Sequence, residues 1–157
     1  MSKNLLITLV LFFMLNLNAD ASMVSFFVLE TGVADNLVNN EHSMNWESAF
    51  MDVFFDAGHI VSNASSLRMR TRPEDIENTA SFEIEDARRG GVDFLFIIQI
   101  DYNADSPTPE NIIIYLYKMI PFTKITERAM TARTYRSSRE ELDDYKSIVR
   151  GFIPLIN

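Results

Sequence analysis

The chain has 157 residues, of which 47% are hydrophobic, and its 14 lysines and arginines face 22 aspartates and glutamates, giving a net charge of −8. Nucleic acids are bound by basic surfaces that release counterions, so this composition argues against a nucleic-acid partner. The chain has no cysteine, which excludes disulfides, zinc–thiolate sites, cysteine nucleophiles and a lipid anchor on an amino-terminal cysteine.

The first 21 residues have the layout of a secretory signal peptide. Lys3 precedes an apolar run from Leu5 to Leu17, and the small residues Ala19 and Ala21 follow it. The run is shorter than the roughly 20 residues that a membrane span needs, so we expect cleavage near Ala21 and no membrane span afterwards. The sequence thus predicts an exported protein, periplasmic or secreted, with residues 1–21 as the signal peptide and 22–157 as one globular domain.

The first half of this domain alternates between strand and helix patterns. Met23 to Thr31 is an apolar run rich in β-formers, which predicts a central strand. An amphipathic helix follows, with its apolar stripe at Trp46, Ala49, Phe50, Val53, Phe54 and Ala57. We expect Ser43 or Asn45 to cap this helix and Gly58 to end it. A second strand is expected within residues 59–69.

The second half contains a helix, a three-stranded meander and a closing helix. Pro73 suits the first turn of a helix whose apolar face is formed by Ile76, Ala80, Ile84 and Ala87. Val92 to Tyr102 is apolar on both faces, which predicts a central strand. Ile112 to Ile120 predicts the next strand, and Lys124 to Tyr135 carries many charges, as edge strands do. Ser138 to Glu141 matches a capping box, which would open the last helix.

The expected order is therefore β-α-β-α-β-β-β-α in one domain. It predicts an α/β (α+β) fold with a mixed sheet of about five strands and three helices. The two β-α-β crossovers place the early strands parallel, and the meander adds antiparallel neighbours.

Three features carry a resemblance to known domains. They are a helix that ends in glycine before a strand, at Phe55 to Val61; a second helix that runs into the central strand, at Ala87 to Phe94; and the closing meander with its helix. In these features the chain resembles the exported α/β domains found at the amino terminus of TolB, in CsgG and in the lipoprotein activator of a penicillin-binding protein. The resemblance implies a non-catalytic cell-envelope domain that docks to another protein, and it transfers no functional residue.

Three arginines form the candidate small-ligand site. Arg68, Arg70 and Arg72 alternate just before the second helix, so in an extended segment their guanidinium groups share one side near a helix amino terminus. An anion, such as a carboxylate or a phosphate, would fit there. The alternative is a solvated edge in which these arginines pair with the acidic residues that follow them.

Two surfaces are candidates for contact with a partner. Tyr115, Tyr117 and Met119 share one face of the expected fourth strand, and aromatic and methionine side chains are enriched in interfaces. The alternative is that these three side chains belong to the core. The charged last strand is the second candidate, and it could also pair in trans to form a homodimer.

The sequence contains no convincing catalytic, cofactor or metal motif. Its two histidines, His42 and His59, lack the spacing of a metal site, no Gly-x-Ser-x-Gly elbow is present, and the acidic clusters fall at expected helix starts. We therefore expect no catalytic, cofactor-binding or metal-binding residues. The favoured function is docking to another envelope protein or to a second copy, and the alternative is an anion-binding or small-ligand-binding protein or hydrolase with a pocket near Arg68 to Arg72.

Overall fold

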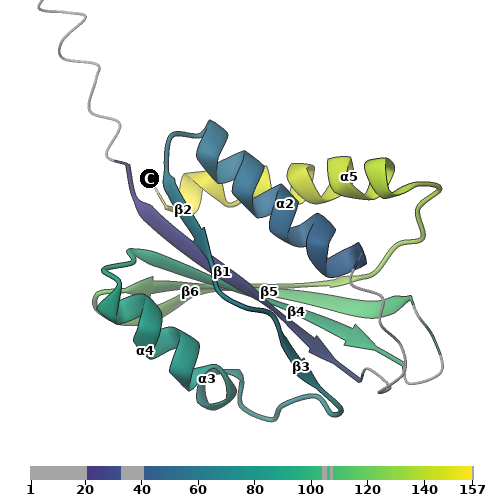
Figure 1. Cartoon of the computed structure of the whole chain (residues 1–157), viewed down its shortest axis with the longest axis horizontal. Helices are drawn as coiled ribbons and strands as arrows, with labels where there is room; N and C mark the ends of the chain where they lie inside the picture. The colour runs from purple at the N-terminus through teal and green to yellow at the C-terminus, as the bar shows by residue number, and fades with distance from the viewer. Residues whose placement is uncertain (1–20, 33–40, 104–105, 107, 157) are drawn as a thin grey trace, which may run out of the picture.

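The computed structural model describes residues 21–32, 41–103, 106 and 108–156. In this part of the chain, helices pack on both faces of a six-stranded mixed sheet, with α2 and α5 on one face and α3 and α4 on the other (Figure 1). The expected α/β class and element order are confirmed. The apolar part of the expected signal peptide lies outside the described residues.

The parallel half of the sheet is built around β1 (Met23–Thr31). On one side β1 pairs with β4 (Phe94–Tyr102), and on the other it pairs first with β2 (Ile60–Asn63) and then with β3 (Leu67–Met69). Both long strands are buried on both faces, as their apolar sequences indicated. The sheet has six strands because residues 59–69 form two short strands along the same side of β1.

The antiparallel half is the expected meander. β5 (Pro109–Met119) pairs with β4, and β6 (Phe122–Thr131) pairs with β5 and forms the edge of the sheet, in the order β2-β1-β4-β5-β6. The β5–β6 register shifts near Leu116, where Ile125 is the extra residue of a bulge. Bulges and charged side chains are common on edge strands because they discourage uncontrolled pairing.

The two helices on one face, α2 (Glu41–Asp56) and α5 (Ser138–Arg150), pack against each other as well as on the sheet. A short 3₁₀ turn, Ile153–Leu155, follows α5. On the other face the expected single helix is divided into α3 (Ile76–Thr79) and α4 (Ser81–Arg89). Within the described residues, no helix is both long enough and apolar enough to cross a membrane.

The core consists of two layers, one on each face of the sheet. The layer beneath α2 and α5 is aromatic, and the rings of Phe50 and Phe96 lie 5.0 Å apart at its centre. It contains five of the six residues of the expected stripe: Trp46, Ala49, Phe50, Val53 and Phe54. The sixth, Ala57, lies beyond the end of α2 and is exposed. The layer beneath α3 and α4 combines β1, β4 and β5 side chains with Ala80 and Ala87. The helical periodicity therefore assigned the stripe to the core correctly as far as Phe54, and it was wrong for Ala57, which follows the end of the helix.

Gly32 closes the end of β1 against the end of β4. Its φ is +74°, and a Cβ built on it would lie 2.1 Å from the carbonyl oxygen of Tyr102. Both the left-handed backbone and the contact require glycine at this position. The packed end of β1 brings its last residues beside the last residues of β4.

Candidate functional site

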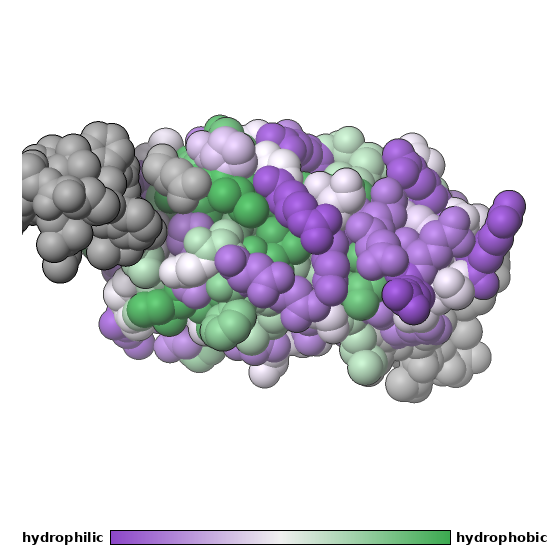
Figure 2. Space-filling view, turned by 90° about the horizontal axis from the view of Figure 1, so that it is seen from above, coloured by the Kyte–Doolittle hydropathy of each residue, from purple (hydrophilic) through white to green (hydrophobic). Residues whose placement is uncertain are grey.

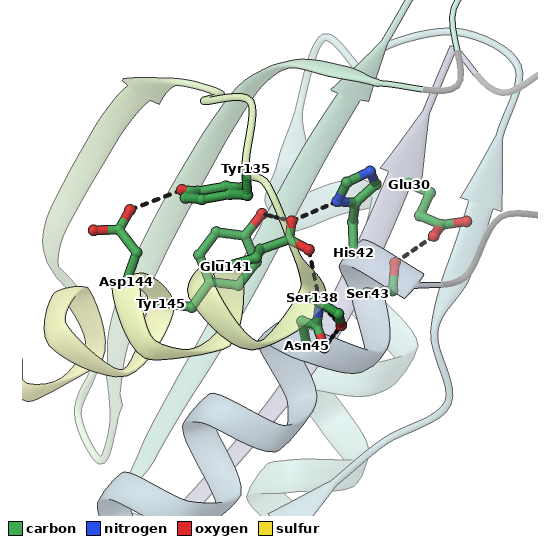
Figure 3. Close-up of polar contacts among 9 residues, drawn as sticks. All are labelled: Glu30, His42, Ser43, Asn45, Tyr135, Ser138, Glu141, Asp144 and Tyr145. Carbon is green, nitrogen blue, oxygen red and sulfur yellow. Dashed lines mark hydrogen bonds and ion pairs between the residues drawn. The ribbon is translucent and has the colours of Figure 1, made fainter.

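A buried carboxylate joins the starts of the two packed helices. Glu141 on α5 is 3% exposed, and its Oε1 lies 2.5 Å from His42 Nδ1 on α2. Tyr145 donates its hydroxyl hydrogen to the same oxygen at 2.6 Å, and Asn45 donates to Oε2 at 2.7 Å. Asn45 also bonds the hydroxyl group of Ser138. Figure 3 shows these side chains converging between α2 and α5.

The start of α5 lies one residue earlier than the expected capping box. Ser137 is the N-cap and accepts the backbone N–H of Glu140, while Glu140 accepts the backbone N–H of Arg136 at 3.0 Å. The box is thus formed by residues 137 and 140, and the prediction for Ser138 to Glu141 was wrong. This shift of one position turns Glu141 inward toward α2.

The start of α2 also differs from the expectation. The helix begins at Glu41, so Ser43 and Asn45 lie inside it and do not cap it. Ser43 instead donates its hydroxyl hydrogen to Glu30 on β1, and Asn45 reaches α5. These two polar side chains therefore fix α2 to the sheet and to α5.

Electrostatics favour the ionised pair of Glu141 and His42. Burial opposes the charge on Glu141, but hydrogen bonds from His42, Tyr145 and Asn45 outweigh it and hold its pKa below the usual value. The hydrogen bond to Glu141 raises the pKa of His42, against the opposing effect of burial. Burial also raises the pKa of Tyr145, which remains a hydrogen-bond donor. Because all three donors already serve Glu141, this carboxylate is suited to fastening the helices together.

Aromatic rings continue the junction toward the edge of the sheet. Tyr145 stacks on Trp46 at 3.9 Å between ring centroids and meets Tyr135 edge-on at 5.9 Å. The hydroxyl group of Tyr135 donates to Asp144 at 2.7 Å, and Arg133 binds the same carboxylate through both oxygens. The segment after β6 is thereby held against α5.

Two cavities open beside this segment. The larger, about 610 Å³, lies between the end of β6 and α5 and has an apolar wall formed by Ile112, Met130, Ala132, Tyr145 and Ile148. The smaller, about 290 Å³, is lined by polar residues that include His42, Ser138 and Glu141. Arg133 and Tyr135 line both cavities. Among the described residues, no group of three histidine, cysteine, aspartate or glutamate side chains is arranged to hold a metal ion.

Two of the three arginines in the candidate anion site contact acidic side chains at the ends of β1 and β4. Arg68 lies 2.6 Å from Glu30, which is 1% exposed, and Arg72 lies 3.5 Å from Asp101. Arg70 follows β3 and is not buried. The observed partners of Arg68 and Arg72 are therefore carboxylates at strand ends.

One of these carboxylates, that of Asp101, belongs to a second buried polar cluster. Asp101 accepts hydrogen bonds from Thr31 and Gln99, both at 2.6 Å, and Gln99 accepts one from the hydroxyl group of Tyr115 at 3.3 Å. Neither Glu30 nor Asp101 was singled out in the sequence, because each lies inside a strand pattern that is otherwise apolar. Their signal is the interruption of that pattern at the same strand end.

The candidate partner-binding side chains on β5 lie in the interior. Tyr115, Tyr117 and Met119 are 7%, 0% and 1% exposed, and all three belong to the core layer beneath α3 and α4. Phe122 of β6 stacks on Tyr117 at 5.2 Å between ring centroids. The exposed aromatic ring at this edge is therefore that of Phe122.

The β6 edge presents apolar side chains to solvent. Ile120 at the β5–β6 turn is 71% exposed, and Phe122 and Ile125 on β6 are 41% and 38% exposed. Figure 2 looks onto the α2–α5 side, where apolar residues gather on the left half and the right half is mostly polar. Phe55 of α2 is exposed as well.

Comparison with known proteins concerns the fold alone. No family model and no curated protein matches the chain. Similar solved structures include a PelC dodecamer from Paraburkholderia phytofirmans, with 8% identity, coverage of 83% of this chain and 87% of that one, and a TM-score of 0.44. The LpoB C-terminal domain from Salmonella enterica has 14% identity, coverage of 77% and 90%, and a TM-score of 0.48. Lipoprotein GNA1162 from Neisseria meningitidis has 9% identity, coverage of 85% and 99%, and a TM-score of 0.46.

These structures agree in part with the resemblance inferred from the sequence, since they include LpoB and a lipoprotein. TolB and CsgG are not among the three, so that part of the resemblance stays a prediction.

Proposed function

We propose that this chain is a non-catalytic, exported interaction domain that docks to another protein of the cell envelope. The observation that carries the proposal is the β6 edge, where a strand that pairs on one side only, as far as the described residues go, bears the exposed apolar side chains Phe122 and Ile125. Solvent-exposed apolar groups grouped at one edge are typical of protein contact surfaces. The signal-peptide pattern of residues 1–21 supports export.

The buried polar groups support a structural scaffold rather than a reactive centre. Glu141 is saturated by His42, Asn45 and Tyr145, and Glu30 is bonded by Ser43 and Arg68. Catalytic acids and bases need an exchangeable proton within reach of a substrate. Carboxylates that are fully engaged inside the protein instead hold neighbouring elements in place.

Site-specific photo-crosslinking in the native envelope tests the docking proposal. A photo-reactive residue replaces Phe122 or Ile125, and the matched control places it at Phe82 on α4, which is 74% exposed. We expect a single envelope protein to be captured from the β6 positions and not from position 82. Equal capture from all three positions, or no capture from β6, would contradict the proposal.

Export is tested separately by sequencing the amino terminus of the protein recovered from the envelope fraction. Cleavage near Ala21 gives a chain that begins at or close to Ser22. An intact Met1 in the envelope fraction would overturn the signal-peptide assignment, and recovery only from the cytoplasmic fraction would overturn export.

The larger cavity favours a second candidate function, the binding of a small amphipathic molecule. Its apolar wall of Met130, Tyr145 and Ile148 ends at the charged pair of Arg133 and Asp144. Native mass spectrometry of protein purified without denaturant would detect such a ligand as a discrete added mass. A bare protein mass from the native envelope contradicts this candidate.

A further inference from the structure

The β6 edge is basic although the chain as a whole is acidic. Residues 118–139, which run from the end of β5 through β6 to the start of α5, carry a net charge of +5, whereas the whole chain carries −8. Within β6 itself, Lys124, Arg128 and Glu127 give +1. The charged residues in this stretch are Lys118, Lys124, Arg128, Arg133, Arg136, Arg139 and one acidic residue, Glu127. Lys124 and Arg133 are 44% and 70% exposed although each also contacts a carboxylate. This local charge is complementary to an acidic partner.

The outer side of β6 has backbone groups available for another strand. Within the described residues β6 pairs with β5 alone, and the N–H of Ala132 donates to Glu110 of β5 at 2.9 Å. Successive residues of an antiparallel strand direct their N–H groups to opposite sides. The N–H groups of Glu127, Ala129 and Thr131 therefore face outward.

The surroundings of β6 also provide a place for an apolar side chain. The cavity of about 610 Å³ lies between the end of β6 and α5, and Met130 and Ile148 line it from the two sides. An added strand directs every second side chain toward the face of the sheet that α2 and α5 cover, the face on which Met130 lies. One such side chain next to Met130 would reach this cavity.

We propose that β6 accepts an extended acidic segment of a partner protein, which adds to the sheet as a further strand and places an apolar side chain between β6 and α5. The inference rests on the proposed docking function and specifies its surface and the chemistry of its partner. A second copy of this chain is a poorer occupant, because β6–β6 pairing brings the two positively charged stretches 118–139 close together.

The probe is an acetylated ten-residue peptide of alternating valine and glutamate, matched in length to β6, and the control peptide alternates valine and lysine. We expect the acidic peptide to bind and the basic peptide not to bind. At a peptide concentration of ten times Kd, exchange of the outward amides of Glu127, Ala129 and Thr131 should slow about tenfold, because only the free fraction exchanges. Protection that maps to another strand, or absence of binding, overturns the inference.

Two matched pairs of variants separate backbone pairing from charge. Ala129→Pro removes an outward N–H at an edge position where proline is tolerated, and Ala129→Ser keeps it. We expect the proline variant to abolish peptide binding and the serine variant to bind as the parent does. Lys118→Glu with Lys124→Glu should weaken binding about tenfold, a loss expected of charges at the rim of an interface. Arg88→Glu with Arg89→Glu on α4 makes the same change in net charge and should leave affinity unchanged.

Thermal unfolding of each variant checks that it is folded. If Ala129→Pro and the double variant Lys118→Glu with Lys124→Glu both bind the acidic peptide like the parent, the inference fails. If crosslinking at Phe122 captures an envelope protein equally from the parent and from Ala129→Pro, the proposed function stands and strand addition fails. A concentration-dependent dimer that Ala129→Pro abolishes would replace the acidic partner with a second copy.

Discussion

Removal of the Glu141 carboxylate is the sharpest test of how α2 and α5 are held together. In Glu141→Ala, the donors of Asn45 and Tyr145 lose the oxygens that lie 2.7 Å and 2.6 Å away, and His42 loses its partner at 2.5 Å. Tyr145 is 1% exposed and Asn45 is 9% exposed, so both donors lie out of contact with bulk water in the folded protein. Each buried donor left without a partner costs about 1–3 kcal/mol.

His42 contributes less to this loss because its side chain is 18% exposed and can be hydrated. We therefore expect Glu141→Ala to lower the free energy of unfolding by about 3–5 kcal/mol, the range found when a buried pair loses one member. This is a large share of the roughly 5–15 kcal/mol that stabilises a typical domain.

Urea unfolding followed by tryptophan fluorescence measures the effect, because Trp46 stacks directly on Tyr145. The matched control is Glu140→Ala, one residue earlier, whose carboxylate is exposed and accepts the backbone N–H of Arg136. It should cost about 1 kcal/mol, as other helix caps do. If Glu141→Ala costs no more than this control, the buried network does not hold the two helices together.

Three further predictions concern single positions. Gly32→Ala should lower the free energy of unfolding by at least about 2 kcal/mol, because the new Cβ combines a left-handed backbone with a clash against β4. The control Gly58→Ala has a left-handed backbone at φ +88° but meets no atom within 4 Å, so it should cost about 1 kcal/mol. Thermal unfolding measures both. The raised pKa of His42 adds stability that is fully present below pH 6.5, its unfolded pKa, and is lost as the pH rises. The lowered pKa of Glu141 adds stability that is fully present above pH 4.5 and is lost as the pH falls. The free energy of unfolding should therefore be greatest between pH 4.5 and pH 6.5. His42→Gln should remove the decline above pH 6.5 in urea titrations, and a decline that persists unchanged would assign it to another group. Ser137→Ala, which removes the N-cap of α5, should cost about 1 kcal/mol, and no change in urea midpoint would contradict the capping role.

Periodicity and composition were sufficient to locate the main elements. The continuous apolar run at Val92 to Tyr102 required cover on both faces, and β4 has it. The stripe of α2, repeating at helical spacing, lies in the core, and the charged last strand is the sheet edge. Each of these features depends on a regular repeat that one buried face imposes on the sequence.

The candidate site depended on contacts between residues far apart in the chain. Glu141 resembled a helix-capping residue, but a start one position earlier turned it toward Asn45 on α2. Likewise, Arg68 was a candidate for binding an anion or, alternatively, for pairing with the acidic residues that follow it, and the structure shows it in contact with Glu30 on β1. Local spacing does not report which strand end lies beside which loop.

The amino-acid sequence by itself determined the fold class, the order of elements, the core stripe and the acidic character of the chain, because each follows from local periodicity or from a sum over residues. Only the tertiary structure decided that Tyr115 and Tyr117 are buried, that α2 and α5 share the carboxylate of Glu141, and that Arg133 lies beside α5 where it binds Asp144. These features depend on how segments that are distant in the chain pack together, and packing sets which side chains lose contact with water.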